Sequence, residues 1–239
     1  MGHENELWVV RLGTRRWRDV AELQERAREL RLAGAVPDLL LLCEHPPTYT
    51  RGRRRDRAED LPLPDEHYRA QGIEVEDAPR GGHVTYHGPG QLVGYPIMRA
   101  DRPADFVHTM QDVVVEALRE RGVEGARSRW EEGPAFTGVW VEDRKIASIG
   151  IHVSRGVTSH GFAVNVANDL APFDRVVACG LPGTRMTSMA LELGDTCPAD
   201  PVDCLARTTA HRFAGAHGLR QRLVSPTRAG LDRAVATVL

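Results

Sequence analysis

Hydrophobic and polar residues alternate with two different periods along the chain, which predicts a mixture of strands and helices. A period of two over 7–12 and an unbroken apolar run over 38–43 are both typical of strands. Apolar residues at helical spacing over 103–121 indicate the clearest helix, which Gly122 ends. The predicted strands cover residues 7–12, 38–43, 83–86, 92–97, 136–141, 145–153 and 160–166. The predicted helices cover residues 19–33, 103–121, 188–193, 201–217 and 229–238.

These elements do not alternate regularly, and the chain contains no internal repeat, linker or low-complexity segment. A chain of 239 residues is long enough to bury one sizeable core. We therefore expect an α/β fold with one domain and a mixed sheet.

Composition adds little to this picture. Hydrophobic residues make up 41% and charged residues 27% of the chain, and the net charge of -2 indicates no preference for nucleic acid or membrane. No apolar run approaches the length that crosses a membrane, and the first residues do not resemble a signal peptide. We expect a cytoplasmic protein with free thiols at Cys43, Cys179, Cys197 and Cys204, and with no metal site because no Cys-x-x-Cys occurs.

The use of cationic residues is unusual, because the chain has 30 arginines and one lysine, Lys145. Arginine stays protonated near neutral pH, whereas a desolvated lysine is able to lose its proton. Two explanations fit this count. Lys145 is either a chance survivor of a bias toward arginine or a position that needs a titratable amine.

The stretch 80–97 is the richest in residues that build binding sites. It holds five glycines, two prolines, two histidines and one arginine, and a turn over 87–90 separates its two predicted strands. Glycines let the backbone approach a ligand closely, so we interpret the stretch as part of a binding site. The alternative is a glycine-rich hairpin without chemistry. Its spacing does not match a dinucleotide fingerprint.

Cys179 is a candidate nucleophile, because it lies between the apolar residues 176–178 and Gly180. A glycine there lets backbone amides turn toward the sulfur, as in an oxyanion hole. The alternative is an inert, buried cysteine, which Cys43 fits better. A thiolate also needs a positive neighbour or a base, and Lys145 supplies one if the fold brings the two together.

A basic segment at 51–57 contains Arg51, Arg53, Arg54, Arg55 and Arg57. Such a run is usually a solvated loop, and the alternative is a surface that faces an acidic partner.

Residues 38–194 closely resemble the octanoyltransferases of lipoate biosynthesis. The matching motifs are Glu-His-Pro-Pro-Thr-Tyr-Thr at 44–50, Arg-Gly-Gly at 80–82 through Tyr-Pro at 95–96, Thr-Gly-Val-Trp-Val at 137–141, Arg-Lys-Ile-Ala-Ser-Ile-Gly at 144–150, His-Gly-Phe-Ala-Val-Asn at 160–165, and Cys-Gly at 179–180 with Thr-Ser at 187–188. The resemblance implies the catalytic-domain fold of biotin and lipoate protein ligases over 1–239, a single domain with a largely antiparallel mixed sheet flanked by helices.

The resemblance also implies an activity. An octanoyl group moves from octanoyl-acyl carrier protein to a lysine of a lipoyl domain, through a thioester on the enzyme and without a cofactor. The acceptors are the lipoyl domains of 2-oxoacid dehydrogenase E2 subunits and the glycine cleavage H protein. The family's nucleophile corresponds to Cys179 and its assisting lysine to Lys145. Its substrate-binding residues correspond to Arg80, Gly81, Gly82, His83, Val84, Thr85, Tyr86, His87, Ser148, Ile149, Gly150, Gly161, Phe162 and Ala163.

The chain departs from the family pattern at Arg51, at His152 and over 17–20, where the usual Tyr is absent. These departures concern the docking of partners. Two rival functions are an ATP-dependent lipoate or biotin ligase of the same fold and a non-catalytic acyl-binding domain. We expect a monomer, because the predicted elements show no exposed apolar stripe that a second copy of the chain would cover.

Overall fold

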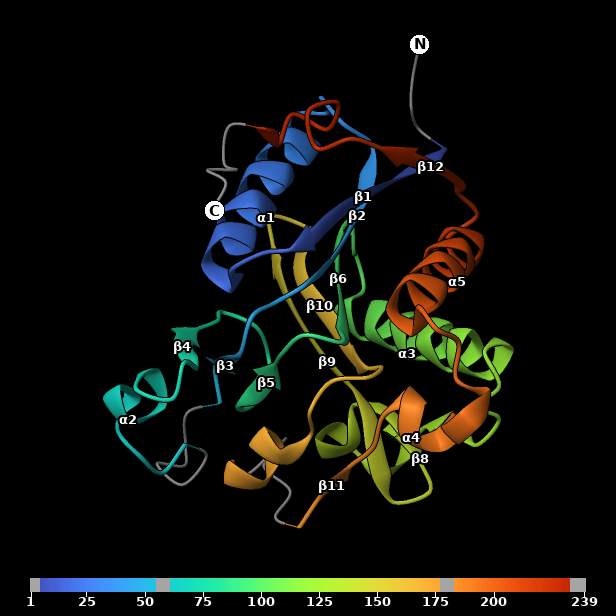
Figure 1. The fold of residues 1–239 in the computed structure, drawn as a ribbon. Helices are drawn as coiled ribbons and strands as arrows, with labels where there is room; N and C mark the ends of the chain where they lie inside the picture. Colours follow the sequence, from blue (N-terminus) through green and yellow to red (C-terminus); the bar gives the residue numbers. More distant parts are fainter. Residues whose placement is uncertain (1–4, 55–60, 177–182, 233–239) are drawn as a thin grey trace.

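The computed structural model describes residues 5–54, 61–176 and 183–232, and its centre is a mixed β-sheet (Figure 1). Within these residues the sheet runs in the order β12-β1-β2-β6-β10-β9-β8-β7, and β11 pairs with β9. Its strands are β1 (Glu6–Thr14), β2 (Asp38–Glu44), β6 (Gln91–Ile97), β7 (Ala126–Ser128), β8 (Gly138–Val141), β9 (Arg144–Ser154), β10 (Val157–Asn165), β11 (Arg185–Met186) and β12 (Arg220–Val224). Parallel pairing joins β12 to β1, β1 to β2 and β11 to β9, and the remaining pairs are antiparallel.

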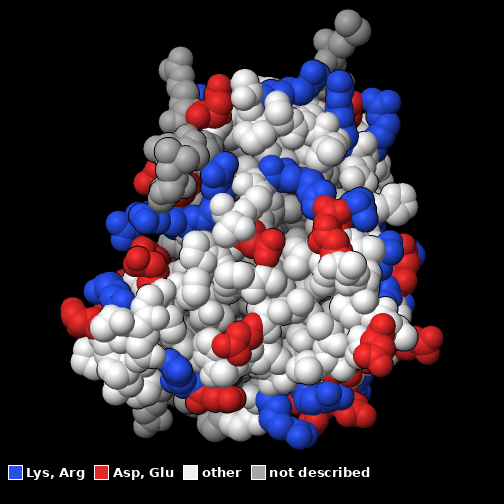
Figure 2. Space-filling view, in the orientation of Figure 1, with Lys and Arg blue, Asp and Glu red and all other residues white. Residues whose placement is uncertain are grey.

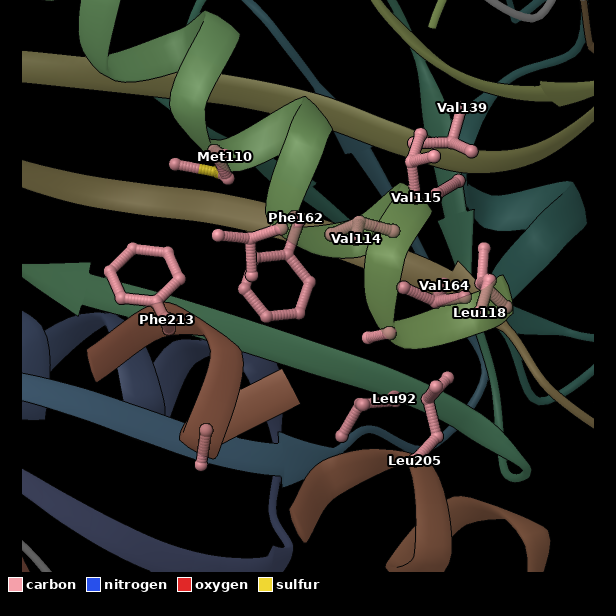
Figure 3. Packing of buried hydrophobic residues seen from close by; sticks show 14 of the residues in the cluster. Leu92, Met110, Val114, Val115, Leu118, Val139, Phe162, Val164, Leu205 and Phe213 are labelled. Atoms are coloured by element: carbon pink, nitrogen blue, oxygen red, sulfur yellow. The ribbon is translucent and has the colours of Figure 1, made fainter. Parts of the chain in front are cut away.

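Helices cover both faces of this sheet, which explains the unbroken apolar run over 38–43. Leu39 and Leu41 pack toward α1, whereas Leu40 and Leu42 pack in the cluster that contains α3 and α5 (Figure 3 shows part of the latter). A strand buried on both faces needs apolar residues at successive positions. The helices are α1 (Trp17–Leu32), α2 (Asp65–Arg69), α3 (Pro103–Glu120), α4 (Met189–Leu193) and α5 (Pro201–Ala216).

The glycine-rich stretch 80–97 is not a hairpin, so the hairpin in the alternative interpretation is wrong, and the binding role of the stretch stays a prediction. Its first strand, β5 (Thr85–His87), belongs to a small second sheet with β3 (Thr48–Arg51) and β4 (Glu74–Asp77), whereas β6 lies in the main sheet. The turn between β5 and β6 is present, since the Gln91 amide donates to the Gly88 carbonyl over 3.1 Å. The stretch therefore links the two sheets, because β5 pairs with β3 and β6 pairs with β2 and β10.

Two predictions about the end of the chain differ from the structure. β12 is a mostly polar edge strand that the sequence pattern does not predict, and its pairing partner β1 is more than 200 residues away. The helix predicted over 229–238 is wrong at its start, where a turn buries Ala229 and Leu231 and Gly230 has a φ of 72°. Residues 233–239 lie outside the described residues. No helix in the described part of the chain is both long and apolar enough to cross a membrane.

Candidate functional site

A cavity of about 270 Å³ lies against β9 and β10 and reaches the glycine-rich segment that precedes β5. This volume is close to the lower end of the range for small-molecule sites. The cavity is lined by Arg80, Gly81, Gly82, His83, Val84, Thr85, His87, Lys145, Ser148, Ile149, Gly150, Gly161, Phe162 and Ala163. The structure thus brings these candidate residues together, and their role in binding stays a prediction.

Two candidate residues are not placed in this cavity. Tyr86 does not line it, because alternation along β5 points Thr85 and His87 to one side and Tyr86 to the other. The Tyr86 ring packs 5.4 Å from the Tyr49 ring instead. Cys179 lies outside the described residues, so its distance to Lys145 stays open.

Several lining residues were not among the candidates. Trp17, Tyr95 and His160 meet near one end of the cavity, and Pro134, Thr137 and Ile151 contribute elsewhere. Tyr95 and His160 do fall inside the matching motifs at 80–96 and 160–165. Trp17 carried no sequence signal, because it reaches the cavity from the first turn of α1.

The chain's sole lysine is buried at the cavity wall. Lys145 is 1% exposed, and its Nζ donates a hydrogen bond to the Thr137 carbonyl over 2.8 Å. The same nitrogen lies 5.2 Å from the centre of the Trp140 ring, because β8 pairs Trp140 with Lys145. The amine is therefore buried and hydrogen-bonded, and it is not a solvated surface charge.

Gly138 makes the room for this amine. A Cβ at this position would crowd the Ala147 carbonyl oxygen and would lie 2.5 Å from Lys145 Cε and 3.0 Å from Nζ; φ is 138°, which side chains rarely adopt. The Gly138 amide donates to Gln111 Oε1 on α3 over 2.9 Å, which ties the segment to the core. Steric crowding thus explains why the motif at 137–141 has a glycine at position 138.

Arg80 organises the glycine-rich segment. Its guanidinium donates to the carbonyl and hydroxyl of Thr50, each over 2.8 Å, and to the carbonyls of His83 and Gly81. The Gly81 amide in turn donates to the Ile151 carbonyl of β9 over 3.1 Å. These bonds hold the segment against β9 before any ligand binds.

Uncharged histidines surround the end of the cavity near Tyr95. His45 donates from Nδ1 to the Arg15 carbonyl over 2.7 Å, so its Nε2 accepts from the Tyr95 hydroxyl over 2.8 Å. Burial lowers the pKa of His45 to about 4 and that of His160 to about 3. Burial also lowers the pKa of His87, which bonds to Gln91. These three histidines are therefore uncharged at neutral pH, although the Arg80 guanidinium is close enough to add to the lowering of the pKa of His87 and His160.

The basic segment is only partly available to a partner. Arg51 forms ion pairs with Asp65 and with Asp77, so its charge is compensated. Arg53 and Arg54 are exposed, and Arg54 also lines the cavity. Arg55 and Arg57 lie outside the described residues. Figure 2 shows positive and negative side chains interspersed over one face of the molecule.

Solved structures with the same fold define the class. A putative lipoate protein ligase from T. acidophilum with bound lipoic acid is 18% identical, covers 97% of this chain and 92% of that one, and gives a TM-score of 0.74. A lipoate-protein ligase A bound with ATP is 17% identical over 96% and 93% of the two chains, with a TM-score of 0.69. These values show the expected fold of lipoate and biotin protein ligases.

The family follows from the sequence itself. The family model for the lipoyl protein ligase A/B catalytic domain matches residues 18–208, and the chain belongs to this family. The octanoyltransferase of Rubrobacter xylanophilus is 45% identical over 190 residues, which are 77% of this chain and 83% of that protein. The octanoyltransferase of Acidobacterium capsulatum is 38% identical over 227 residues, 88% of this chain and 89% of the other.

The buried histidines predict that stability falls in mild acid. His45, His87 and His160 have lower pKa values in the folded protein than in the unfolded chain, which therefore binds more protons between about pH 4 and 6.5. Their contribution is complete above this range and decreases as the pH falls, by about 1.4 kcal/mol per pH unit for each histidine. Urea unfolding at pH 4.5 to 7 measures this slope.

The variant His45→Gln isolates one of these contributions, because all other titrating groups stay the same. We expect a shallower slope than in the wild type, whereas the exposed His211→Gln should leave the slope unchanged. Equal slopes for His45→Gln and wild type would contradict the assignment of a neutral, buried His45.

Gly138→Ala should displace the buried amine of Lys145. The new methyl group would overlap Cε and Nζ, so the side chain has to leave its slot. Since Lys145 is the chain's only lysine, amine acetylation followed by peptide mapping reports on it directly. We expect acetylation at Lys145 to accelerate by about tenfold.

Gly133→Ala is the matched control. Gly133 also has a positive φ, 112°, but a Cβ there would meet nothing within 4 Å. Gly133→Ala therefore controls for the positive φ, whereas the new methyl group of Gly138→Ala also crowds the Ala147 carbonyl and the Lys145 side chain, so only Gly138→Ala should expose Lys145. Equal acetylation rates in both variants would show that strain, and not the steric slot, controls the amine.

Proposed function

We propose that this protein transfers an octanoyl group from octanoyl-acyl carrier protein to a lysine of lipoyl domains, through a thioester on Cys179. The observation that carries the proposal is Lys145, the single lysine of an arginine-rich chain, buried in the wall of a cavity suited to an acyl chain. Relatives at 38% to 45% identity that are named octanoyltransferases support the same reaction.

The reaction has two balanced steps. The Cys179 thiolate attacks the thioester carbonyl, the carbon–sulfur bond to the carrier protein breaks, and the carrier's sulfur leaves as a thiolate, which takes a proton from the Lys145 ammonium, as octanoyl-Cys179 forms. The amine of the acceptor lysine then attacks this thioester, an amide forms and Cys179 is released as a thiol. One thioester replaces another in the first step, so no ATP is consumed.

Lys145 serves both steps in this proposal. As an ammonium it favours the thiolate of Cys179, and as a neutral amine it accepts a proton from the thiol or from the incoming lysine. The hydrogen bond to the Thr137 carbonyl holds Nζ in place. Backbone amides are the donors proposed for the oxyanion.

The cavity offers the acyl chain an apolar surface. Ile149 and Ile151 of β9 and Phe162 and Ala163 of β10 supply it. Phe162 fits because Gly94 on the neighbouring strand leaves room for its ring, which a Cβ would overlap. Burying the six methylenes of an octanoyl chain contributes about 5 kcal/mol to binding.

The partners follow from the reaction. The acceptors proposed are the lipoyl domains of 2-oxoacid dehydrogenase E2 subunits and the glycine cleavage H protein, served by a monomer in the cytoplasm. Carrier proteins and lipoyl domains are acidic, so the exposed Arg53 and Arg54 beside the cavity would steer their approach.

Intact mass measures the proposed intermediate. After mixing with octanoyl carrier protein, the wild type should gain the mass of one octanoyl group, and peptide mapping should find it on Cys179. Cys179→Ser should abolish transfer to a lipoyl domain. An adduct on Cys43, Cys197 or Cys204 would contradict the assignment. Efficient transfer from free octanoate with ATP, without carrier protein, would favour the ATP-dependent ligase instead.

Lys145→Arg separates the amine from its charge. Arginine keeps a positive charge but does not accept a proton, so turnover should fall by roughly 100-fold or more, as in Lys145→Ala. Alkylation of Cys179 by iodoacetamide, measured against pH, reports whether the thiolate still forms. Turnover within a few fold of wild type would show that charge alone is sufficient.

A further inference from the structure

A second cavity, of about 190 Å³, adjoins the closed end of the acyl cavity. It lies between α1 and the ends of β9 and β10 that are remote from Lys145. Its polar lining comes from Gln24, Glu25, Arg28, His152, Ser154 and Ser159. We call this space the polar chamber.

His160 separates the two spaces. Among the described residues that line them, His160 alone borders both the acyl cavity and the polar chamber. The β9–β10 register places it opposite Ile151, whereas Lys145 lies six positions earlier on β9. Lys145 and His160 line the same cavity, so a chain that starts beside the Lys145 amine and runs along the β9–β10 pair extends toward His160.

The His160 side chain is held as a rigid wall. Its ring stacks on Trp17, with 6.1 Å between ring centres and an angle of 6° between planes, and it meets the Tyr95 ring edge-on at 6.4 Å. Its backbone amide donates to Gln24 Oε1 over 2.7 Å. The φ of 58° is unusual for a residue other than glycine, so the surrounding contacts impose this conformation.

The polar chamber is unsuited to an alkyl group. Gln24 is 2% exposed and lines the chamber, and its Nε2 has no hydrogen-bond partner within the described part of the chain. The orientation of this amide is fixed, because its oxygen accepts the His160 amide. An alkyl terminus in the chamber would keep water from Nε2, whereas a hydroxyl group could accept its hydrogen bond.

We propose that His160 sets the longest acyl chain that the site accepts, by closing the acyl cavity against a chamber that receives only polar chain ends. This inference rests on the proposed octanoyl transfer and adds its chain-length limit. The low pKa of His160, about 3, agrees with a neutral ring beside an alkyl terminus.

The variant His160→Gly joins the two spaces. Glycine tolerates the positive φ, and the backbone hydrogen bond to Gln24 is retained. Transfer rates are measured for octanoyl, decanoyl and 10-hydroxydecanoyl carrier proteins. The wild type should discriminate against both ten-carbon chains by about tenfold or more relative to octanoyl.

In His160→Gly, 10-hydroxydecanoyl should gain about tenfold relative to octanoyl, and decanoyl should gain less because its methyl end meets polar groups. His160→Asn is a second variant, since Asn tolerates this backbone conformation with a smaller side chain, and should give an intermediate gain. Ser159→Ala, which changes the chamber and keeps the wall, should retain the wild-type order of chain lengths.

The outcomes separate this inference from the function on which it rests. A wild type that transfers no octanoyl group refutes the proposed function, and the chain-length limit with it. An active wild type with unchanged selectivity in folded His160→Gly and His160→Asn refutes the role of His160 alone. An equal gain for decanoyl and 10-hydroxydecanoyl refutes the selectivity of the polar chamber.

Discussion

The close approach of backbones around the β9–β10 strand pair is the constraint on which the site depends. Gly150 and Gly161 face each other in this pair. A Cβ on Gly150 would lie 2.9 Å from the Gly81 carbonyl oxygen, and one on Gly161 would overlap the Gly94 carbonyl. Because both positions lack a side chain, the glycine-rich segment closes over β9 and β6 closes against β10, which leaves a narrow cavity along the pair.

Several polar groups at this cavity are held by bonds within the protein. Arg80 resembles a binding residue in the sequence, yet its guanidinium holds the loop through bonds to Thr50 and to nearby carbonyls. His45 and Tyr95 bond to each other at the closed end. A cavity for an alkyl chain needs such satisfaction, because an unpaired buried polar group disfavours burial of the ligand beside it.

The same strand pair relates the two ends of the site. Lys145 near the start of β9 and His160 near the start of β10 lie at opposite ends of the antiparallel pair. One rigid strand pair thus fixes the distance between the proposed site of acyl transfer and the proposed chain-length limit. Strands position such groups more reliably than loops do.

The sequence by itself determined most of the main elements and the family to which the chain belongs. Periodicity located the main strands and helices, since burial on one or two faces leaves a regular pattern over neighbouring residues. The single lysine among 30 arginines and the motif resemblance singled out Lys145 without coordinates.

Only the tertiary structure decided what depends on residues far apart in the chain. It separated β5 from β6, added β12 beside β1, and turned Tyr86 away from the cavity. It also brought Trp17 onto His160, more than 140 positions later, where both rings line the cavity. No local pattern encodes these contacts, because the pairing of strands and the packing of side chains between them are settled by competition among all segments of the folded chain.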